Sequence, residues 1–198
     1  MDREKRQRTV RRLAGLGILL ALAFGLGYLD YLIPLDAVGV PGIKLGLANL
    51  AVLAALYLYG WREAALVSGV RILLFFFVFG NLTSFLFSLA GGLCSYLGMV
   101  LFRRVSLFDE LGVSVIGAVL HNTGQMAAAL FLLGSDGILW YYPVLLIAAV
   151  LSGSAIGLLF RTLNRRLLGR IGSRLGVSRA EGKKEDTDGE KDGDEKGS

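Results

Sequence analysis

Six polar side chains interrupt the apolar stretches of this chain, and they are the groups best suited to bind a ligand. They are Lys44, Asn49, Arg71, His121, Asn122 and Gln125. An isolated polar group is costly to bury in hydrocarbon, so its presence there indicates a ligand or a structural partner. Two cations beside an imidazole and amides suit a small polar or anionic molecule. We therefore predict substrate-binding rather than catalytic roles for these residues. The structural alternative is that Arg71 pairs with a carboxylate such as Asp30 and that the Asn, His and Gln side chains bond to backbone carbonyls of neighbouring helices.

The composition indicates that apolar helices must position these groups. Of the 198 residues, 54% are hydrophobic and only 19% are charged. The charges gather at the two ends and in short loops, whereas a soluble domain spreads them over its surface. This pattern is typical of a polytopic membrane protein. The net charge of +5 then indicates orientation in a membrane, and we expect no nucleic-acid partner.

The apolar stretches predict an all-α protein with six transmembrane helices. Their expected ranges are residues 13–33, 44–60, 64–79, 82–102, 111–133 and 138–160. We expect four regions in the chain. These are a basic arm over residues 1–12, the six-helix domain over 13–160, a basic amphipathic segment over 161–177 and a disordered charged tail over 178–198. The first apolar run is too long for a signal peptide and lacks a small-residue cleavage site, which predicts a membrane span.

The distribution of Lys and Arg predicts the orientation. The expected loops 34–43, 80–81 and 134–137 contain neither residue type. The loops on the other side carry Arg62 and Arg103–Arg104, and both terminal regions are basic. Positive charge is retained on the cytoplasmic side of membranes. We therefore predict a multi-pass protein of the cell membrane with both termini in the cytoplasm.

This topology predicts that the polar groups share one depth. Asp30, Thr83 and Ser84 would lie near the outer ends of their helices, and Arg71 and His121 near the middle of theirs. His121 and Gln125 are four residues apart, so they share a helical face. With Lys44 and Asn49 of the second expected span, polar groups from five helices would thus meet in the outer half of the membrane. We predict a small cavity that is open to the outside.

Small residues follow one face of the first expected span. Gly17, Ala21 and Gly25 are spaced by four residues, which lets another helix approach closely. Two interpretations stay open at this point. The face packs against another helix of the same chain, or it docks against a membrane partner subunit.

The residues give little support for a metal site or for ATP hydrolysis. One cysteine, Cys94, and one histidine cannot form a protein-only zinc or iron–sulfur site. The glycine-rich stretches lack the Lys-Ser/Thr ending of a P-loop, so we expect no ATPase activity in this chain. No metal or other cofactor is required by this interpretation. Energy for active transport would come from a partner or an ion gradient.

The segment PGIKLGLANL over Pro41–Leu50 and the segment HNTGQ over His121–Gln125 carry a resemblance. Over residues 10–165 the chain resembles the Gx transporter family, also labelled heptaprenyl diphosphate synthase component I. This family is similar to the S components of energy-coupling factor (ECF) vitamin transporters. The resemblance implies six helices, a ligand taken from outside, and docking on a transmembrane partner driven by two ATPases. The docking signature of S components is Ala-xxx-Ala, and Gly17, Ala21 and Gly25 occupy that spacing here.

The same resemblance implies two alternatives. One is a membrane component that accompanies a prenyl diphosphate synthase in isoprenoid-quinone synthesis. Such synthases bind magnesium diphosphate through Asp-rich motifs, and the comparable acids here are Asp109 and Glu110, which favours a non-catalytic role. The other is a membrane component of flavin-based extracellular electron transfer, with a bound flavin or quinone.

Overall fold

Helices form all the regular structure of the described part of the chain. The computed structural model describes residues 3–32, 46–80, 82–134 and 136–165. The elements are α1 (Arg3–Leu32), α2 (Asn49–Leu58), α3 (Trp61–Phe79), α4 (Leu82–Phe102), α5 (Glu110–Leu133), the 3₁₀ helix η2 (Asp136–Tyr141) and α6 (Tyr142–Leu163). Lys44, the expected tail over 178–198 and the basic segment beyond residue 165 lie outside the described residues.

Four helical segments of the described chain are long and apolar enough to cross a membrane. They are α1, α4, α5 and the stretch Gly137–Leu163, which includes α6. The expected count of six is therefore met in part. Helix α2 has 10 residues, which gives it about 15 Å at about 1.5 Å per residue, half of the roughly 30 Å of hydrocarbon in a bilayer. Helix α3 has 19 residues but carries Arg62, Glu63 and Arg71.

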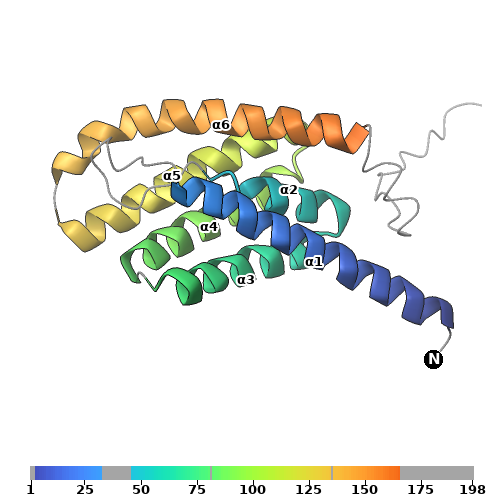
Figure 1. Cartoon of the computed structure of the whole chain (residues 1–198). Coiled ribbons are helices and arrows are strands. Elements are labelled where there is room, and N and C mark those ends of the chain that lie inside the picture. The colour runs from blue at the N-terminus through green and yellow to red at the C-terminus, as the bar shows by residue number, and fades with distance from the viewer. Residues whose placement is uncertain (1–2, 33–45, 81, 135, 166–198) are drawn as a thin grey trace, which may run out of the picture.

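The short helix α2 lies at the centre of the bundle and contacts each of the other α-helices (Figure 1). Its residues from Asn49 to Leu56 are all buried. A helix that is hydrophobic on every face is stable only when protein or lipid surrounds it on every face. The stretch 44–60 was expected to form a membrane span, and its described helix is shorter, Asn49–Leu58. The other helices surround α2, and this central position explains how so short a helix is accommodated.

Small residues allow the long helices to approach closely. A Cβ added at Gly124 of α5 would lie 2.7 Å from the Ala90 carbonyl oxygen of α4. A Cβ added at Gly153 of α6 would lie 2.8 Å from Val115 Cα of α5. In both cases the neighbour is backbone, which cannot move aside cheaply. Such contacts replace the hydrophobic effect as the source of packing energy between helices in lipid.

One end of the bundle gathers the basic residues, and we call it the basic end. The amino end of α1 and the carboxyl end of α6 both lie there (Figure 1). Arg12 of α1 pairs with Glu63 of α3, and Arg161 of α6 lies 3.4 Å from Asp109. Asp109 also caps α5, accepting a hydrogen bond from Gly112 N at 2.9 Å. Every Lys and Arg in the described part of the chain, except Arg71, belongs to this end or to the protruding first turns of α1.

The glycine contacts can be tested with a matched pair of alanine substitutions. Gly153→Ala places a methyl group against the backbone of α5 and should lower the free energy of unfolding by about 1–3 kcal/mol. Gly17→Ala adds a methyl group where the described residues leave open space, and it should be neutral or stabilising because Ala favours helix by about 1 kcal/mol. Thermal unfolding of the full chain in detergent measures both. Equal destabilisation by the two variants would contradict the packing described above.

Candidate functional site

A pocket at the end opposite the basic end is lined by polar side chains from separate helices. We call it the polar pocket, and its atom-free space is about 330 Å³ including solvent at its mouth. Its lining residues are Gly27, Asp30, Gly46, Arg71, Ile72, Phe75, Ser88 and His121. The charged and ionisable groups come from α1, α3 and α5. Three elements distant in sequence thus supply the groups of one site.

Helical spacing explains why these residues meet. Gly27 and Asp30 are three apart on α1, and Arg71 and Phe75 are four apart on α3, so each pair occupies one face. A Cβ at Gly27 would lie 2.7 Å from Phe75 Cε2, so the ring of Phe75 rests directly on this glycine. The close contact of α1 with α3 at this point brings Asp30 toward Arg71.

Arg71 and Asp30 are both withdrawn from solvent, with 7% and 3% of their surfaces exposed. The Asp30 carboxylate acts electrostatically on the Arg71 guanidinium. A buried cation is tolerated in an apolar interior only where an opposite charge or hydrogen-bond acceptors compensate it. Asp30 provides this compensation from the neighbouring helix.

A glycine turn closes the polar pocket at the amino end of α2. Gly46 has a φ of +80°, a left-handed conformation that favours glycine. Its carbonyl accepts a hydrogen bond from Asn49 N at 2.9 Å. A Cβ at Gly46 would lie 3.1 Å from Asn49 Nδ2 and 3.3 Å from His121 Cδ2. The turn therefore places Asn49 and His121 side by side at the pocket wall.

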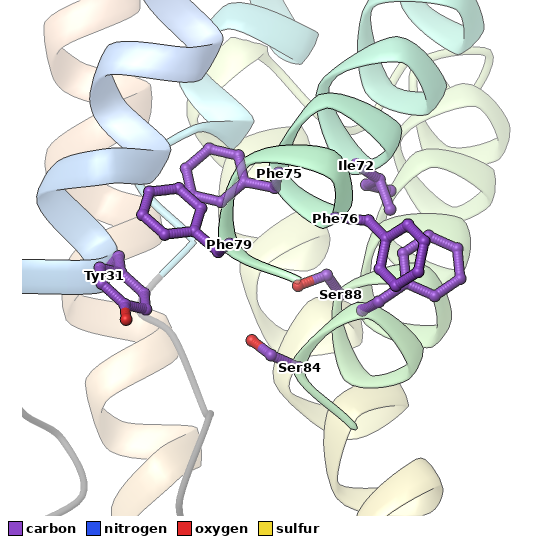
Figure 2. A pocket seen from close by; sticks show the side chains of 8 residues that line it. Tyr31, Ile72, Phe75, Phe76, Phe79, Ser84 and Ser88 are labelled. Carbon is purple, nitrogen blue, oxygen red and sulfur yellow. The ribbon is translucent and has the colours of Figure 1, made fainter. Parts of the chain in front are cut away.

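A second pocket adjoins the first, and aromatic rings form most of its wall. We call it the aromatic pocket, and its atom-free space is about 300 Å³. It is lined by Tyr31, Ile72, Phe75, Phe76, Phe79, Ser84, Phe85 and Ser88. Figure 2 shows Phe75 and Phe79 side by side, and the hydroxyls of Ser84 and Ser88 directed toward the part of the pocket where Tyr31 and Phe79 lie. Ile72, Phe75 and Ser88 line both pockets.

The structure separates the five predicted site residues that it describes, Lys44 being outside the described residues. Arg71 and His121 line the polar pocket, and Asn49 contacts its wall at Gly46. Asn122 instead faces α6, where its Nδ2 donates to the Leu145 carbonyl oxygen at 3.0 Å. Gln125 has no exposed surface and packs where α4 approaches α5 at Gly91. Neither Asn122 nor Gln125 lines either pocket.

The small-residue face of α1 points away from the described bundle. Gly17, Ala21 and Gly25 are exposed, and nothing described lies within 4 Å of a Cβ added at Gly17 or Gly25. The face that packs inward is instead Gly15, Leu19, Ala23 and Gly27. No helix of the described part of the chain therefore packs on the face that Gly17, Ala21 and Gly25 form.

Several pocket residues were not predicted as site residues. Tyr31, Phe79, Phe85 and Ser88 are examples. Their spacing in the sequence could have identified some of them. Arg71, Phe75 and Phe79 follow one another at intervals of four residues and so share a helical face, as do Ser84 and Ser88. The adjacent ring Phe77 points outward with 77% of its surface exposed, so the run Phe75–Phe77 is not one functional unit.

The two acids compared with diphosphate-binding motifs have structural roles at the basic end. Asp109 caps α5 and pairs with Arg161, and Glu110 accepts a hydrogen bond from Asn164 Nδ2 at 2.6 Å. Within the described residues, no three His, Cys, Asp or Glu side chains gather closely enough to hold a metal ion.

The Gly46 turn gives a sharp test of this geometry. Gly46→Ala combines a positive φ with crowding against Asn49 and His121, whereas Gly134→Ala adds Cβ at a positive φ with open space around it among the described residues. The backbone cost is about 1–2 kcal/mol in either variant, and the crowding adds to it only at Gly46. Thermal unfolding should therefore show Gly46→Ala as clearly the less stable. The geometry would be refuted by a Gly46→Ala protein no less stable than Gly134→Ala.

Comparison with known proteins places this helical bundle in a family. The family model described as heptaprenyl diphosphate synthase component I matches residues 19–163. That range begins at Leu19 of α1 and ends at Leu163, the last residue of α6. It contains every residue that lines the two pockets. No curated protein and no solved structure matches the chain. The chain belongs to the family of heptaprenyl diphosphate synthase component I.

Proposed function

We propose that this chain is a non-catalytic membrane subunit that binds a small polar molecule, in the manner of a transporter S component. The observation that carries the proposal is the polar pocket, where Asp30, Arg71 and His121 converge from three helices. Buried polar groups in a membrane bundle are expensive, and they persist where they serve a ligand or a partner.

The arrangement of charges supports capture from outside the cell. Under the positive-inside rule the basic end faces the cytoplasm. The polar pocket then lies toward the external half of the membrane, with Arg71 partway along α3. A substrate from outside would reach it without crossing the bundle. We accordingly assign the protein to the cytoplasmic membrane, with the amino end of α1 and the carboxyl end of α6 inside.

The proposal retains six membrane helices, of which α3 carries charged residues and α2 is short. Helix α3 crosses with Arg62 and Glu63 in its first turn at the basic end and Arg71 at the pocket. Helix α2 is surrounded by protein, so its ends meet the pocket and the basic end rather than lipid. Arg103, directly after α4, donates to the Leu56 carbonyl oxygen near the carboxyl end of α2. A short helix is tolerated at membrane depth when its end groups are satisfied in this way.

The outward face of α1 supports a membrane partner. Gly17, Ala21 and Gly25 present a smooth surface that leaves room for another helix at close range. A transmembrane subunit docked there, with ATPases in trans, would supply the energy that this chain lacks. No resident cofactor is needed for this role, and a flavin or quinone would enter as ligand.

A second candidate is a non-catalytic component that accompanies a prenyl diphosphate synthase. The family description and the apolar aromatic pocket favour it, because such a wall suits an isoprenoid chain. In that case the retained ligand would be a prenyl compound. The engagement of Asp109 and Glu110 in helix capping and packing at the basic end supports placing catalysis in another subunit.

Native mass spectrometry of the gently solubilised full chain tests the proposal. A small molecule should be retained by the wild type. A hydrogen bond to a charged group contributes about 1.5–3 kcal/mol, so Arg71→Gln should reduce its occupancy about tenfold or more. The matched control is Arg104→Gln at an exposed position of the basic end, which should retain the ligand fully.

Two further variants guard against misfolding of Arg71→Gln. His121→Gln keeps a polar group of similar size, and Ser88→Leu fills space in both pockets without altering a charge. Each should also lose the ligand while melting like the wild type. Retention of the ligand by folded variants at all three positions would refute the proposed site.

A further inference from the structure

We propose that the protruding first turns of α1 bind an acidic stretch near the end of this same chain. We call residues 3–12 the basic extension and residues 185–195 the acidic tail, which lies outside the described residues. The contact would form at the basic end and does not depend on the ligand of the polar pocket. Its support comes from the charge of the basic extension, the direction in which that charge points, and the length and charge of the chain that follows α6.

The basic extension is not held by packing. Every residue from 3 to 14 is exposed, and Figure 1 shows α1 running past its neighbouring helices at this end. Val10, the apolar residue of the extension, leaves 57% of its surface exposed. Hydrophobic burial, which stabilises most helices in proteins, therefore contributes little to these turns.

The charges of the basic extension are unfavourable to the helix as it stands. Glu4 is its one acid, and its six basic residues are Arg3, Lys5, Arg6, Arg8, Arg11 and Arg12. Cations near a helix amino end oppose the macrodipole, and like charges three or four residues apart repel each other. Arg12 pairs with Glu63. The four basic residues before Val10 form no ion pair within the described residues, so a bound polyanion would stabilise the extension.

Part of this charge points toward the side from which the chain end comes. Lys5, Arg8 and Arg12 continue, at spacings of three and four residues, the face of α1 that is buried at Gly15 and Leu19. Helix α2 contacts both α1 and α6, so α6 lies on that side of α1. The carboxyl end of α6 lies at the same end of the bundle as the basic extension (Figure 1). A chain that continues from α6 thus starts on the side that Lys5 and Arg8 face.

The acidic tail has the length and the charge to reach and match this face. Its 11 residues include seven acids and one lysine. Twenty residues lead from Arg165 to Glu185, and they span at most about 65 Å, several times the roughly 10 Å diameter of a helix. Because both partners belong to one chain, their effective concentration is about millimolar. While the tail is bound, the extension presents little net positive charge to other acidic surfaces.

The anionic membrane surface is a less favourable occupant. In the proposed orientation the apolar part of α1 begins at Leu13, and Arg3 lies ten residues before it, about 15 Å along the helix axis. The headgroup layer is about 5–8 Å thick, and the Debye length is about 8 Å at physiological ionic strength. The leaflet would therefore meet Arg11 and Arg12, whereas the first turn of the extension projects beyond it.

Spin-label distances test the contact on the full chain in vesicles with about one third anionic phosphatidylglycerol. One pair of labels is placed on Thr9→Cys in the basic extension and Thr187→Cys in the acidic tail, substitutions that change no charge. The comparison pair uses Thr162→Cys, exposed near the end of α6, with the same Thr187→Cys. Both pairs are made in a Cys94→Ser background because Cys94 is exposed. Double electron–electron resonance measures the two distance distributions.

We expect the distance from Thr9 to Thr187 to be narrowly distributed and shorter than the distance from Thr162 to Thr187. An unbound tail gives the opposite order, because Thr162 is much nearer to Thr187 along the chain. Raising the salt to about 0.5 M, where the Debye length is about 4 Å, should abolish the short distance.

Charge reversal identifies the binding face. Lys5→Glu with Arg8→Glu should reduce the population at the short distance about fivefold or more. Glutamate near a helix amino end is favourable, so this change does not unwind the extension. Adding Asp186→Lys and Asp188→Lys should restore the short distance. The matched control, Arg62→Glu with Arg104→Glu at exposed positions of the basic end, should leave it unchanged.

Three results would each overturn the inference. The first is a shorter distance for the pair on Thr162 and Thr187, which would place the tail near α6 or the basic residues that follow it. The second is a short distance that survives reversal of Lys5 and Arg8, or that the swapped charges do not restore. The third is a short distance seen in phosphatidylcholine vesicles and lost with phosphatidylglycerol, which would assign the extension to the leaflet.

Discussion

The structure depends on the accommodation of one arginine inside an apolar bundle. Arg71 lies on α3 with 7% of its surface exposed. Its charge is tolerated because Asp30 of α1 approaches from the neighbouring helix, and this approach requires the ring of Phe75 to rest on Gly27. The contact of α1 with α3, the aromatic wall and the polar pocket thus all meet at this pair of charges. Removing Arg71 or Asp30 alone would leave an uncompensated charge in the interior.

Close packing through glycines makes room for the central helix. The contacts of α5 with α4 and α6 at Gly124 and Gly153 bring these backbones together. Within this frame α2 lies with protein on every side, and its amino end, at the Gly46 turn, meets His121.

The sequence predicted the all-helical class and the places of the long helices. These features follow from hydropathy and from the distribution of Arg along the chain. The sequence did not show that α2 is central, because an apolar run has the same composition whether it meets lipid or protein. It also could not separate His121 from Asn122 and Gln125. All three lie on α5, and their different roles depend on the directions of α4 and α6, as the bond from Asn122 to Leu145 shows. The sequence likewise could not show which of the two glycine-containing faces of α1 packs inward, the one with Gly15 and Gly27 or the one with Gly17 and Gly25.

Access to the polar pocket from the outer side tests the account most directly. Ser88 lines both pockets, and a cysteine there can be labelled with a membrane-impermeant thiol reagent in intact cells, in a Cys94→Ser background because Cys94 is exposed. We predict that Ser88→Cys reacts from outside. We also predict that Ser106→Cys, in the exposed loop at the basic end, reacts only after the cells are permeabilised. Labelling of Ser88→Cys only after permeabilisation, or of Ser106→Cys in intact cells, would contradict an outward-facing binding site.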